Sequence, residues 1–257
     1  MSSLQDRIVF ITGATSGIGR SCVRAFAAEG ARVLFCGRRP DRLKGLADEI
    51  ASEFGVPTHF FSLDVRDRGA VDAALSGLPA EWAAIDVLVN NAGLSRGLDK
   101  LHEGKIDDWE EMIDTNVKGL LYVSRAVIPG MVARGRGHII NIGSIAGHEL
   151  YPGGNVYCAT KFAVNALSRG LRLDLNGSPL RVTTVDPGMV ETEFSLVRFH
   201  GDGGRAGKVY QGFRPLSPDD VAEAVVFCAG RPAHVNISEV IIMPTAQASP
   251  TMVHRTP

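Results

Sequence analysis

The sequence has little cysteine, no long apolar run and almost no net charge. Its four cysteines are widely spaced and contain no C-x-x-C pair: Cys22, Cys36, Cys158 and Cys228. This spacing argues against a disulfide framework and against a cysteine-rich metal site, so we expect no metal. The formal net charge is -1, from 27 basic and 28 acidic residues. Without an excess of positive charge to bind phosphates, a nucleic-acid partner is not expected.

Targeting and membrane signals are also lacking. The first residues do not have the profile of a signal peptide, and no apolar run approaches the length needed to span a membrane. Hydrophobic residues make up 45% of the 257 residues, enough for a sizeable core. With no linker-like stretch in the composition, we expect one domain over residues 1–257, in a reduced cytoplasmic protein with no membrane partner.

Short apolar runs alternate with helical patterns along the whole chain. This alternation predicts parallel strands joined by crossover helices, which is a single Rossmann-type, doubly wound α/β sheet with helices on both faces. The glycine-rich segment at about 190–215 interrupts the alternation and is interpreted as a mobile lid over a substrate. We expect about seven strands, at 8–11, 33–36, 59–63, 85–89, 138–142, 180–185 and 240–243, and a long helix at 107–134.

A glycine-rich turn follows the first predicted strand, with the spacing G-x-x-x-G-x-G over residues 13–19. Such a turn lets backbone N–H groups approach a pyrophosphate at the start of the next helix. A simple strand-to-helix connection is the alternative, but the position after the first strand of an α/β chain favours phosphate binding. The candidate residues are Gly13, Thr15, Ser16, Gly17, Ile18 and Gly19.

The end of the second predicted strand indicates which cofactor binds. NAD sites usually have an acidic residue there, whereas an arginine accommodates the 2′-phosphate of NADP. This sequence has Arg38 and Arg39, and no acid until Asp41. Two solvated arginines at a helix start are the alternative. We predict NADP, because two guanidiniums can bind a phosphate and no carboxylate repels it.

The third and fourth predicted strands end at the same edge of the sheet, where the adenosine half of a cofactor would lie. Asp64 and Val65 end the third strand, and the sequence Asn-Asn-Ala-Gly follows the fourth. These residues could equally be loop terminators. Their common edge favours cofactor contact by Asp64, Val65, Asn91, Ala92 and Gly93.

A hydroxyl, a phenol and an ammonium follow the fifth strand: Ser144, Tyr157 and Lys161. Tyr157 and Lys161 are four residues apart, so they share one face of a helix. A surface pair is the alternative for Tyr-x-x-x-Lys alone. Beside a cofactor, Lys161 and an oxidised nicotinamide would lower the phenol pKa from about 10, making Tyr157 an acid/base. Ser144 would donate a hydrogen bond to the substrate oxygen.

Together these residues resemble the short-chain dehydrogenase/reductase family over nearly the whole chain. The resemblance implies a seven-stranded parallel sheet, a nicotinamide cofactor and a homotetramer that pairs the long helix and the Tyr157 helix. It also implies a catalytic tetrad of Asn116, Ser144, Tyr157 and Lys161, in which Asn116 holds a water of a proton relay. By the same resemblance, four further residues lie beside the nicotinamide and phosphates: Pro187, Gly188, Val190 and Thr192.

Several stretches are similar to the NADP-dependent 3-hydroxy acid dehydrogenases of this family. They lie at 78–82, 151–157, 194–199, 232–237 and 244–249. The similarity implies oxidation of L-serine, L-allo-threonine or 3-hydroxyisobutyrate at C3, or reduction of the matching semialdehyde. Two departures are Cys158, where a smaller residue is common, and a segment after Gly188 that is about one residue shorter than in some members.

A 3-hydroxy acid carries a carboxylate, so its pocket should contain a cation. Arg198 is the candidate because it lies on the predicted lid, after the nicotinamide stretch; Arg96 is a weaker one. Arg198 could instead pair with a neighbouring acid or face a subunit interface.

Two other functions compete with this one. An NADPH-dependent reductase of another small carbonyl compound, such as sulfoacetaldehyde or a general ketone, would use the same residues. A non-catalytic NADP sensor is less favoured, because such a protein would be expected to lose the tyrosine or the lysine. A hydrolase is not supported, because His138 and His148 have no obvious role beside Ser144.

Overall fold

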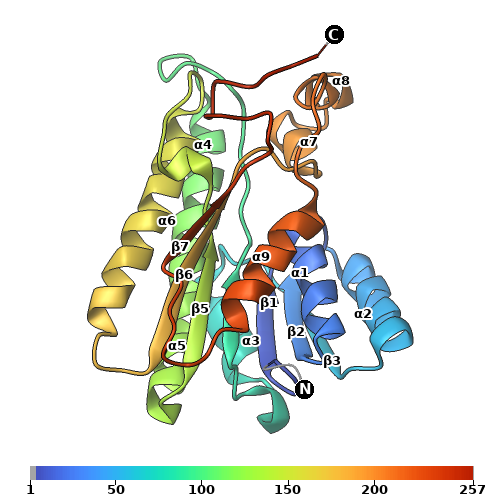
Figure 1. Cartoon of the computed structure of the whole chain (residues 1–257), viewed down its shortest axis with the longest axis vertical. Coiled ribbons are helices and arrows are strands. Elements are labelled where there is room, and N and C mark those ends of the chain that lie inside the picture. Colours follow the sequence, from blue (N-terminus) through green and yellow to red (C-terminus); the bar gives the residue numbers. More distant parts are fainter. Residues whose placement is uncertain (1–3, 257) are drawn as a thin grey trace.

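The seven predicted strands form one parallel sheet in the order β3-β2-β1-β4-β5-β6-β7 (Figure 1). The description rests on a computed structural model and covers residues 4–256. The order reverses direction between β1 and β4, where ligands bind in doubly wound sheets. The strands are β1 (Ile8–Thr12), β2 (Arg32–Gly37), β3 (Thr58–Ser62), β4 (Val87–Asn90), β5 (Gly137–Ile142), β6 (Leu180–Pro187) and β7 (Glu239–Ile242).

Helices cover both faces of the sheet. One core packs α1 (Gly17–Ala28), α2 (Pro40–Phe54) and α9 (Pro218–Ala229) against it. On the other face, a second core packs α3 (Arg68–Ser76) and α5 (Leu120–Arg134), with part of α6 (Asn155–Asp174). The sheet is therefore the middle of three layers, as the alternation of strands and helices predicts.

The central strands are apolar because both of their faces are covered. All five residues of β1 are buried, and Phe10, Ile11 and Phe35 are fully inaccessible to solvent. Burial of each such side chain contributes about 1.5–3 kcal/mol. This continuous apolar pattern is what distinguishes a buried parallel strand from a half-exposed one.

The long helix predicted at 107–134 is not one regular α-helix. It consists of α4 (Ile106–Ile113), a π-helical turn (Asp114–Gly119) and α5, in direct succession. A π turn inserts one extra residue and shifts the faces of the helix, which a 3.6-residue period cannot reveal. The predicted lid contains two short helices, α7 (Phe194–Arg198) and α8 (Gly203–Lys208). No helix between residues 4 and 256 is long and apolar enough to cross a membrane.

Candidate active site

A cavity of about 430 Å³ opens at the carboxyl ends of the strands. Ser144 and nearly every predicted cofactor residue line it, although they come from six strand ends and from the helices that follow. Gly19 is the one predicted cofactor residue that does not line this cavity. The predicted residues that line the cavity are Gly13, Thr15, Ser16, Gly17, Ile18, Arg38, Arg39, Asp64, Val65, Asn91, Ala92, Gly93, Ser144, Tyr157, Lys161, Pro187, Gly188, Val190 and Thr192.

The glycine turn has the backbone that phosphate binding requires. Gly13 and Gly17 have φ angles of 70° and 52°, in the left-handed region that favours glycine. Gly19 lies below the turn, where an added Cβ would be 2.4 Å from the carbonyl oxygen of Gly13. The Asn91 side chain stabilises the turn by donating hydrogen bonds to the carbonyl oxygens of Thr12 and Gly13, at 2.8 and 3.2 Å. The turn is therefore held in place before any ligand arrives.

The two arginines after β2 have different partners. Arg39 reaches over the glycine turn, and its Nη2 donates to Thr15 Oγ1 at 2.8 Å and to Ser16 Oγ at 2.9 Å. Its Nη1 lies 2.8 Å from Glu193 Oε2 at the start of the lid. Arg38 points elsewhere, with Nη1 3.8 Å from Glu111 Oε1. Arg38 and Arg39 therefore have separate carboxylate partners but line the same cavity, and the prediction that both guanidiniums bind one phosphate stays a prediction.

Asp64 lines the cavity near the charge of Arg38. Burial alone would raise its pKa, but hydrogen bonds from Arg66 and that residue's charge hold the pKa below its usual value. The shortest of these contacts, from Arg66 Nη2 to Asp64 Oδ2, is 2.6 Å. Asp64 is consequently ionised at neutral pH and can accept hydrogen bonds from a ligand.

Ser144, Tyr157 and Lys161 come together at the inner end of the cavity. Ser144 follows β5, and its main-chain N–H donates to Asp186 Oδ1 at 3.0 Å. Tyr157 lies in the first turn of α6, and the side chain of Ser144 acts to lower the pKa of its phenol. Lys161 is one turn further on, with Nζ donating to the carbonyl oxygen of Ile142 at 2.9 Å. All three side chains are buried, so their geometry is fixed by packing.

Burial dominates the electrostatics of Tyr157 within the protein itself, and the effect expected from Lys161 with an oxidised nicotinamide stays a prediction. Burial raises the pKa of the phenol, while the charge of Arg198 and the hydrogen bond with Ser144 lower it by less. Burial also lowers the pKa of Lys161 to about 8, opposed by the nearby Asp186 carboxylate. Sequence spacing reveals the i,i+4 pair but not its desolvation, which disfavours the charged form of both groups. The nearest charge acting to lower the pKa of the phenol is Arg198.

Asn116 does not line the cavity but lies directly behind it, in the π turn. Its side chain forms a closed pair of hydrogen bonds with the backbone of Leu94, both at 2.8 Å, and donates to Thr160 Oγ1 at 3.0 Å. Asn116 Oδ1 and Lys161 Nζ both flank Gly93, at 3.2 and 3.8 Å from the position of a Cβ there. The fold thus brings the four predicted catalytic residues to one place.

Arg198 ends α7 and points toward Tyr157, although it does not line the large cavity. Its guanidinium carbon lies 5.6 Å from the centre of the Tyr157 ring, and Nη2 donates to the Tyr151 hydroxyl at 3.1 Å. Within residues 4–256 no carboxylate forms an ion pair with Arg198. Arg96, in contrast, is paired with Glu111 at 2.6 Å. Of the two arginines considered for the substrate carboxylate, Arg198 is therefore the one that lies beside the Tyr157 phenol without an acidic partner among the described residues.

Residues 255–256 lie against the segment that is predicted to be a lid. The main-chain N–H of Thr256 donates to the carbonyl oxygen of Gly212 at 2.7 Å, and Arg255 Nη2 donates to that of Val209 at 2.9 Å. In Figure 1 this tail runs across the top of the molecule near α8. The segment that follows α8 is therefore held by the end of the chain.

Several residues that line the cavity were not predicted from the sequence. Glu193, Phe194 and Val197 belong to the predicted lid, and Thr115 and Ile142 come from the π turn and from β5. The Phe194 ring packs edge-on against Tyr157, with centroids 5.6 Å apart. Only Glu193 had a signal in the sequence, as an acid next to the predicted Thr192 contact.

Residues 7–201 match the family described as short chain dehydrogenase. The chain belongs to the short-chain dehydrogenase family. It is 52% identical over 250 residues to the NADP-dependent 3-hydroxy acid dehydrogenase YdfG of Escherichia coli O157:H7, covering 96% of this chain and 99% of that protein. It is 41% identical over 256 residues to the NADP-dependent 3-hydroxy acid dehydrogenase of Schizosaccharomyces pombe, covering 99% of each.

Two solved structures of serine dehydrogenases are similar to this chain in fold and in sequence. A serine dehydrogenase in its closed form, complexed with NADP+, superposes with a TM-score of 0.91 at 51% identity, covering 97% of this chain and 100% of that one. The serine dehydrogenase from Escherichia coli has a TM-score of 0.82 at 47% identity, covering 94% and 99%. The short-chain dehydrogenase fold predicted from the sequence is confirmed over the whole sheet.

Proposed function

We propose that this short-chain dehydrogenase uses NADP to interconvert a small 3-hydroxy acid and its 3-oxo acid or semialdehyde. L-serine, L-allo-threonine and 3-hydroxyisobutyrate are the proposed substrates. The similarity to NADP-dependent 3-hydroxy acid dehydrogenases and to serine dehydrogenase supports the class of reaction. The observation that carries the substrate class is Arg198, a cation beside Tyr157 with no acidic partner within the described residues.

The cavity fits the proposed cofactor. The turn at 13–19 presents main-chain N–H groups at the start of α1, where a pyrophosphate is stabilised. Arg39 donates hydrogen bonds to Thr15 and Ser16 of that turn, where its guanidinium would bind a 2′-phosphate, and Arg38 lines the same cavity as a second cation. No acidic residue ends β2 to compete for a ribose hydroxyl. These features favour NADP over NAD.

The buried polar residues would manage the proton. When bound, the nicotinamide accepts or supplies the hydride. Tyr157 would take the proton from the substrate hydroxyl during oxidation and return it during reduction, while Ser144 holds the substrate oxygen. Lys161, held by the carbonyl oxygen of Ile142, would stabilise the phenolate. Asn116 fixes the backbone at Leu94, and its place in a water relay remains part of the proposal.

Arg198 would bind the carboxylate of the substrate. A charge-assisted hydrogen bond contributes about 1.5–3 kcal/mol, so its loss should cost about 10- to 100-fold in affinity. The test measures KM and kcat of Arg198→Ala for 3-hydroxyisobutyrate and for its uncharged amide. Arg205→Ala is the matched control, because Arg205 lies on α8 of the same lid and stacks on Phe199 at 4.3 Å.

We expect a rise in KM for the acid alone, and only in Arg198→Ala. An equal KM for the acid in wild type and variant would contradict the assignment. A panel of L-serine, L-allo-threonine, malonic semialdehyde, sulfoacetaldehyde and a neutral ketone, monitored through NADPH, separates the 3-hydroxy acid function from a general carbonyl reductase. No turnover of any of them would favour a sensor.

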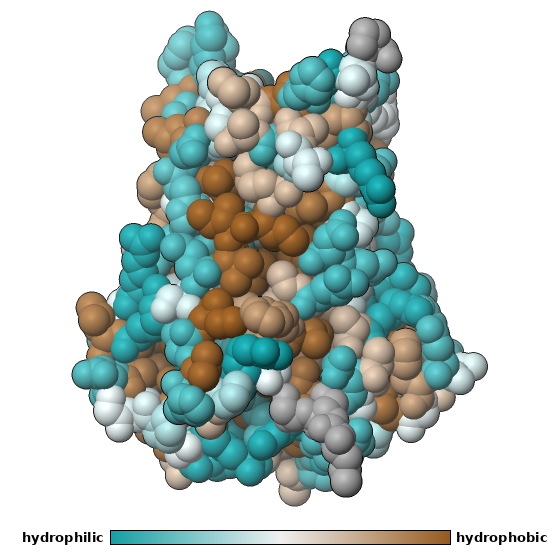
Figure 2. All heavy atoms as spheres, viewed as in Figure 1, coloured by the Kyte–Doolittle hydropathy of each residue, from teal (hydrophilic) through white to brown (hydrophobic). Residues whose placement is uncertain are grey.

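We also propose that the chain forms a homotetramer. Leu121 and Val132 on α5 and Phe162 and Leu173 on α6 are exposed, from 41% to 77%, on the two helices implied for one interface. Figure 2 shows apolar side chains gathered over β7 and beside α9, where Phe227 and Ile241 are 53% and 48% exposed. β7 is the last strand of the sheet, and an open edge favours pairing. Light scattering should give four times the chain mass.

A further inference from the structure

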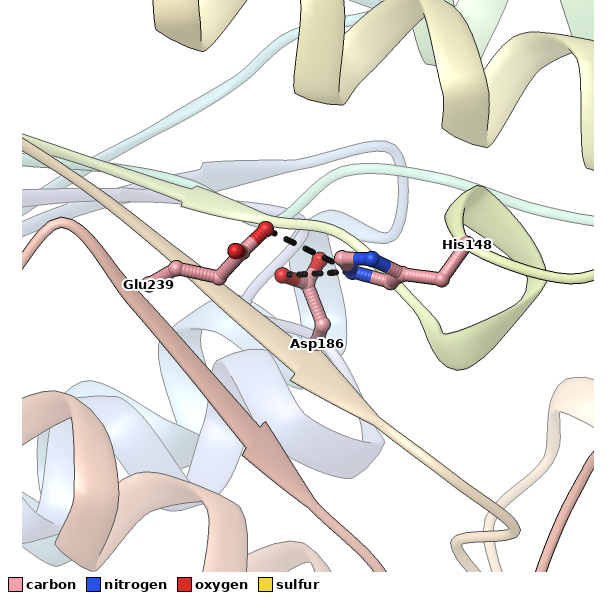
Figure 3. A group of neighbouring side chains, drawn as sticks. All are labelled: His148, Asp186 and Glu239. Carbon is pink, nitrogen blue, oxygen red and sulfur yellow. Dashed lines mark ion pairs between the residues drawn. The ribbon is translucent and has the colours of Figure 1, made fainter.

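The residues proposed to hold the two ends of the substrate are themselves supported from outside the cavity. On one side, Asp186 Oδ1 accepts the main-chain N–H of Ser144 at 3.0 Å, and two further side chains lie beside that carboxylate (Figure 3). Arg198 is supported from another direction, by residues 95–97, which follow β4. Neither Asp186 nor any of residues 95–97 lines the cavity, so both supports lie outside the binding space.

Three hydrogen bonds join the loop after β4 to the end of α7. The main-chain N–H of Gly97 donates to the carbonyl oxygen of Arg198 at 2.9 Å. Arg198 Nε donates to the buried hydroxyl of Ser95 at 3.2 Å. Arg96 Nη1 donates to the carbonyl oxygen of Val197. The loop therefore holds both the main chain of α7 and the side chain of Arg198.

Arg96 links this loop to a second element, α4. Its Nε donates to Glu111 Oε2 at 2.6 Å, while Nη1 of the same guanidinium donates to the carbonyl oxygen of Val197. The side chains of Arg96 and Glu111 are 18% and 19% exposed, so their ion pair is largely shielded from water. Because a guanidinium is planar and rigid, fixing its Nε on Glu111 also fixes the direction in which Nη1 donates. Glu111 therefore orients Arg96 toward the backbone of α7.

Glu111 is kept ionised by the arginines around it. Arg96 contacts Oε2, and the Nη1 atoms of Arg66 and Arg38 lie 3.5 and 3.8 Å from Oε1. The hydrogen bond from Arg96 and the charges of the three arginines hold the pKa of the Glu111 carboxyl below its usual value, although burial opposes them. The carboxylate is therefore a charged acceptor for Arg96 at neutral pH.

Arg96 itself is poorly placed to bind a substrate carboxylate. Two of its nitrogens are engaged, one by a carboxylate and one by a main-chain carbonyl, and the residue does not line the large cavity. Arg198 differs, because only its Nε and Nη2 donate hydrogen bonds within residues 4–256, to Ser95 and to Tyr151. With those two nitrogens fixed, Arg198 Nη1 is left to donate to a carboxylate.

We propose that Arg96, oriented by Glu111, is a positioning residue that places Arg198 for the substrate carboxylate. This inference rests on the proposed function, in which Arg198 binds that carboxylate. Arg96 would not touch the substrate; it would fix the end of α7, and with it the origin of the Arg198 side chain, relative to Tyr157. A displacement of about 1 Å can cost about 10²-fold in rate, so such support matters. Arg96 would serve the recognition of charged substrates and not the proton transfer.

The experiment compares wild type, Arg96→Ala, Arg198→Ala and the double variant. KM and kcat are measured at saturating NADP for 3-hydroxyisobutyrate and for its uncharged amide, and circular dichroism verifies that each variant is folded. Lys100→Ala is the matched control, because it removes an exposed cation from the same loop and should leave both constants unchanged. We expect Arg96→Ala to raise the KM for the acid at least about threefold and to keep kcat and the KM for the amide within about twofold. Because Arg96 acts through Arg198, the double variant should have the KM of Arg198→Ala alone.

Two further variants test the bridge between α4 and α7. Glu111→Gln keeps the shape of the side chain and removes its charge, so it should raise the KM for the acid as Arg96→Ala does. Arg96→Lys keeps the positive charge, but one ammonium cannot reproduce the two separate donors that contact Glu111 and Val197. Arg96→Lys should therefore resemble Arg96→Ala. A wild-type KM in Arg96→Lys would overturn the proposal, because the charge alone would then be sufficient.

Three other results would overturn the proposal. Additive effects of Arg96→Ala and Arg198→Ala on the KM for the acid would mean that Arg96 binds the carboxylate independently. An equal rise in KM for the acid and for the amide would mean that the predicted lid is loosened in general. If Arg198→Ala raises the KM for the acid and Arg96→Ala does not, this inference fails and the proposed function stands. If Arg198→Ala leaves that KM unchanged, the role of Arg198 in the proposed function fails, and the inference fails with it.

Discussion

Among residues 4–256, Glu193 is the carboxylate that forms an ion pair with Arg39, the cation proposed to bind the 2′-phosphate. Glu193 Oε2 lies 2.8 Å from Arg39 Nη1, and Oε1 lies 2.7 Å from Arg42 Nη1. A phosphate bound by Arg39 would compete with Glu193 for the same guanidinium and would be repelled by its charge. We therefore expect Glu193→Gln to bind NADPH more tightly than wild type does.

The size of the change in NADPH affinity follows from the solvent exposure of the Arg39–Glu193 ion pair. The side chains of Arg39 and Glu193 are 40% and 38% exposed, and such solvent-screened pairs contribute about 0.2–1 kcal/mol. Loss of the competing pair should lower the Kd for NADPH by about two- to fivefold. The Kd for NADH should hardly change, because NADH lacks the 2′-phosphate.

Fluorescence titration with NADPH and NADH measures both constants. Glu191→Gln is the matched control, since it removes an exposed carboxylate two residues away on the same segment. Weaker NADPH binding by Glu193→Gln would refute the reasoning, because it would mean that Glu193 orients Arg39 for the cofactor. An equal gain for NADH would refute it as well, since the effect would then not concern the 2′-phosphate.

Three further predictions concern the buried residues. Tyr157→Phe should lose at least about 10²-fold in kcat, because the phenol hydroxyl moves the proton, and should keep its Kd for NADPH within about threefold. Steady-state kinetics measures kcat and fluorescence titration measures the Kd. Near-normal turnover would exclude Tyr157 as the acid/base. Burial lowers the pKa of His138 to about 3 from 6.5, so between these pH values the unfolded chain binds a proton that the folded chain does not. Stability should therefore fall as pH drops through this range, by about 5 kcal/mol at most from this residue, and the fall should be shallower in His138→Gln when urea unfolding is repeated at several pH values. Gly143→Ala should destabilise the fold by about 3 kcal/mol, because its Cβ would lie 1.7 Å from Asp186 Oδ1. Gly170→Ala is the control, because that position has open space around it, and it should be neutral or stabilising in the same urea experiment. Equal stability of Gly143→Ala and Gly170→Ala would contradict the packing argument.

The sheet could be predicted because its signals are local. A strand buried on both faces needs a continuous apolar run, and each run at the predicted positions is a strand within one or two residues of its bounds. The glycine turn also has a local signature, since Gly13 and Gly17 need positive φ angles. The π turn at 114–119 has no such signature, because one extra residue hardly changes the apolar period.

The contacts inside the site were less predictable because they join distant parts of the chain. Glu193 meets Arg39 across 154 positions, and nothing in the Gly-Arg-Arg sequence shows that Arg38 and Arg39 turn apart. The direction of the Tyr157 pKa shift depends on burial by neighbours that spacing does not reveal. His148, Asp186 and Glu239 meet only because β6 lies between β5 and β7 in the sheet.

The contact between residues 255–256 and the segment after α8 has a practical consequence for protein engineering. Arg255 and Thr256 bind the backbone at Val209 and Gly212, just after α8. Truncation before Arg255 would remove these hydrogen bonds. Constants measured on a protein shortened in this way would then include the loss of the contacts that hold the segment after α8. Immobilisation or fusion through the other terminus leaves these hydrogen bonds undisturbed.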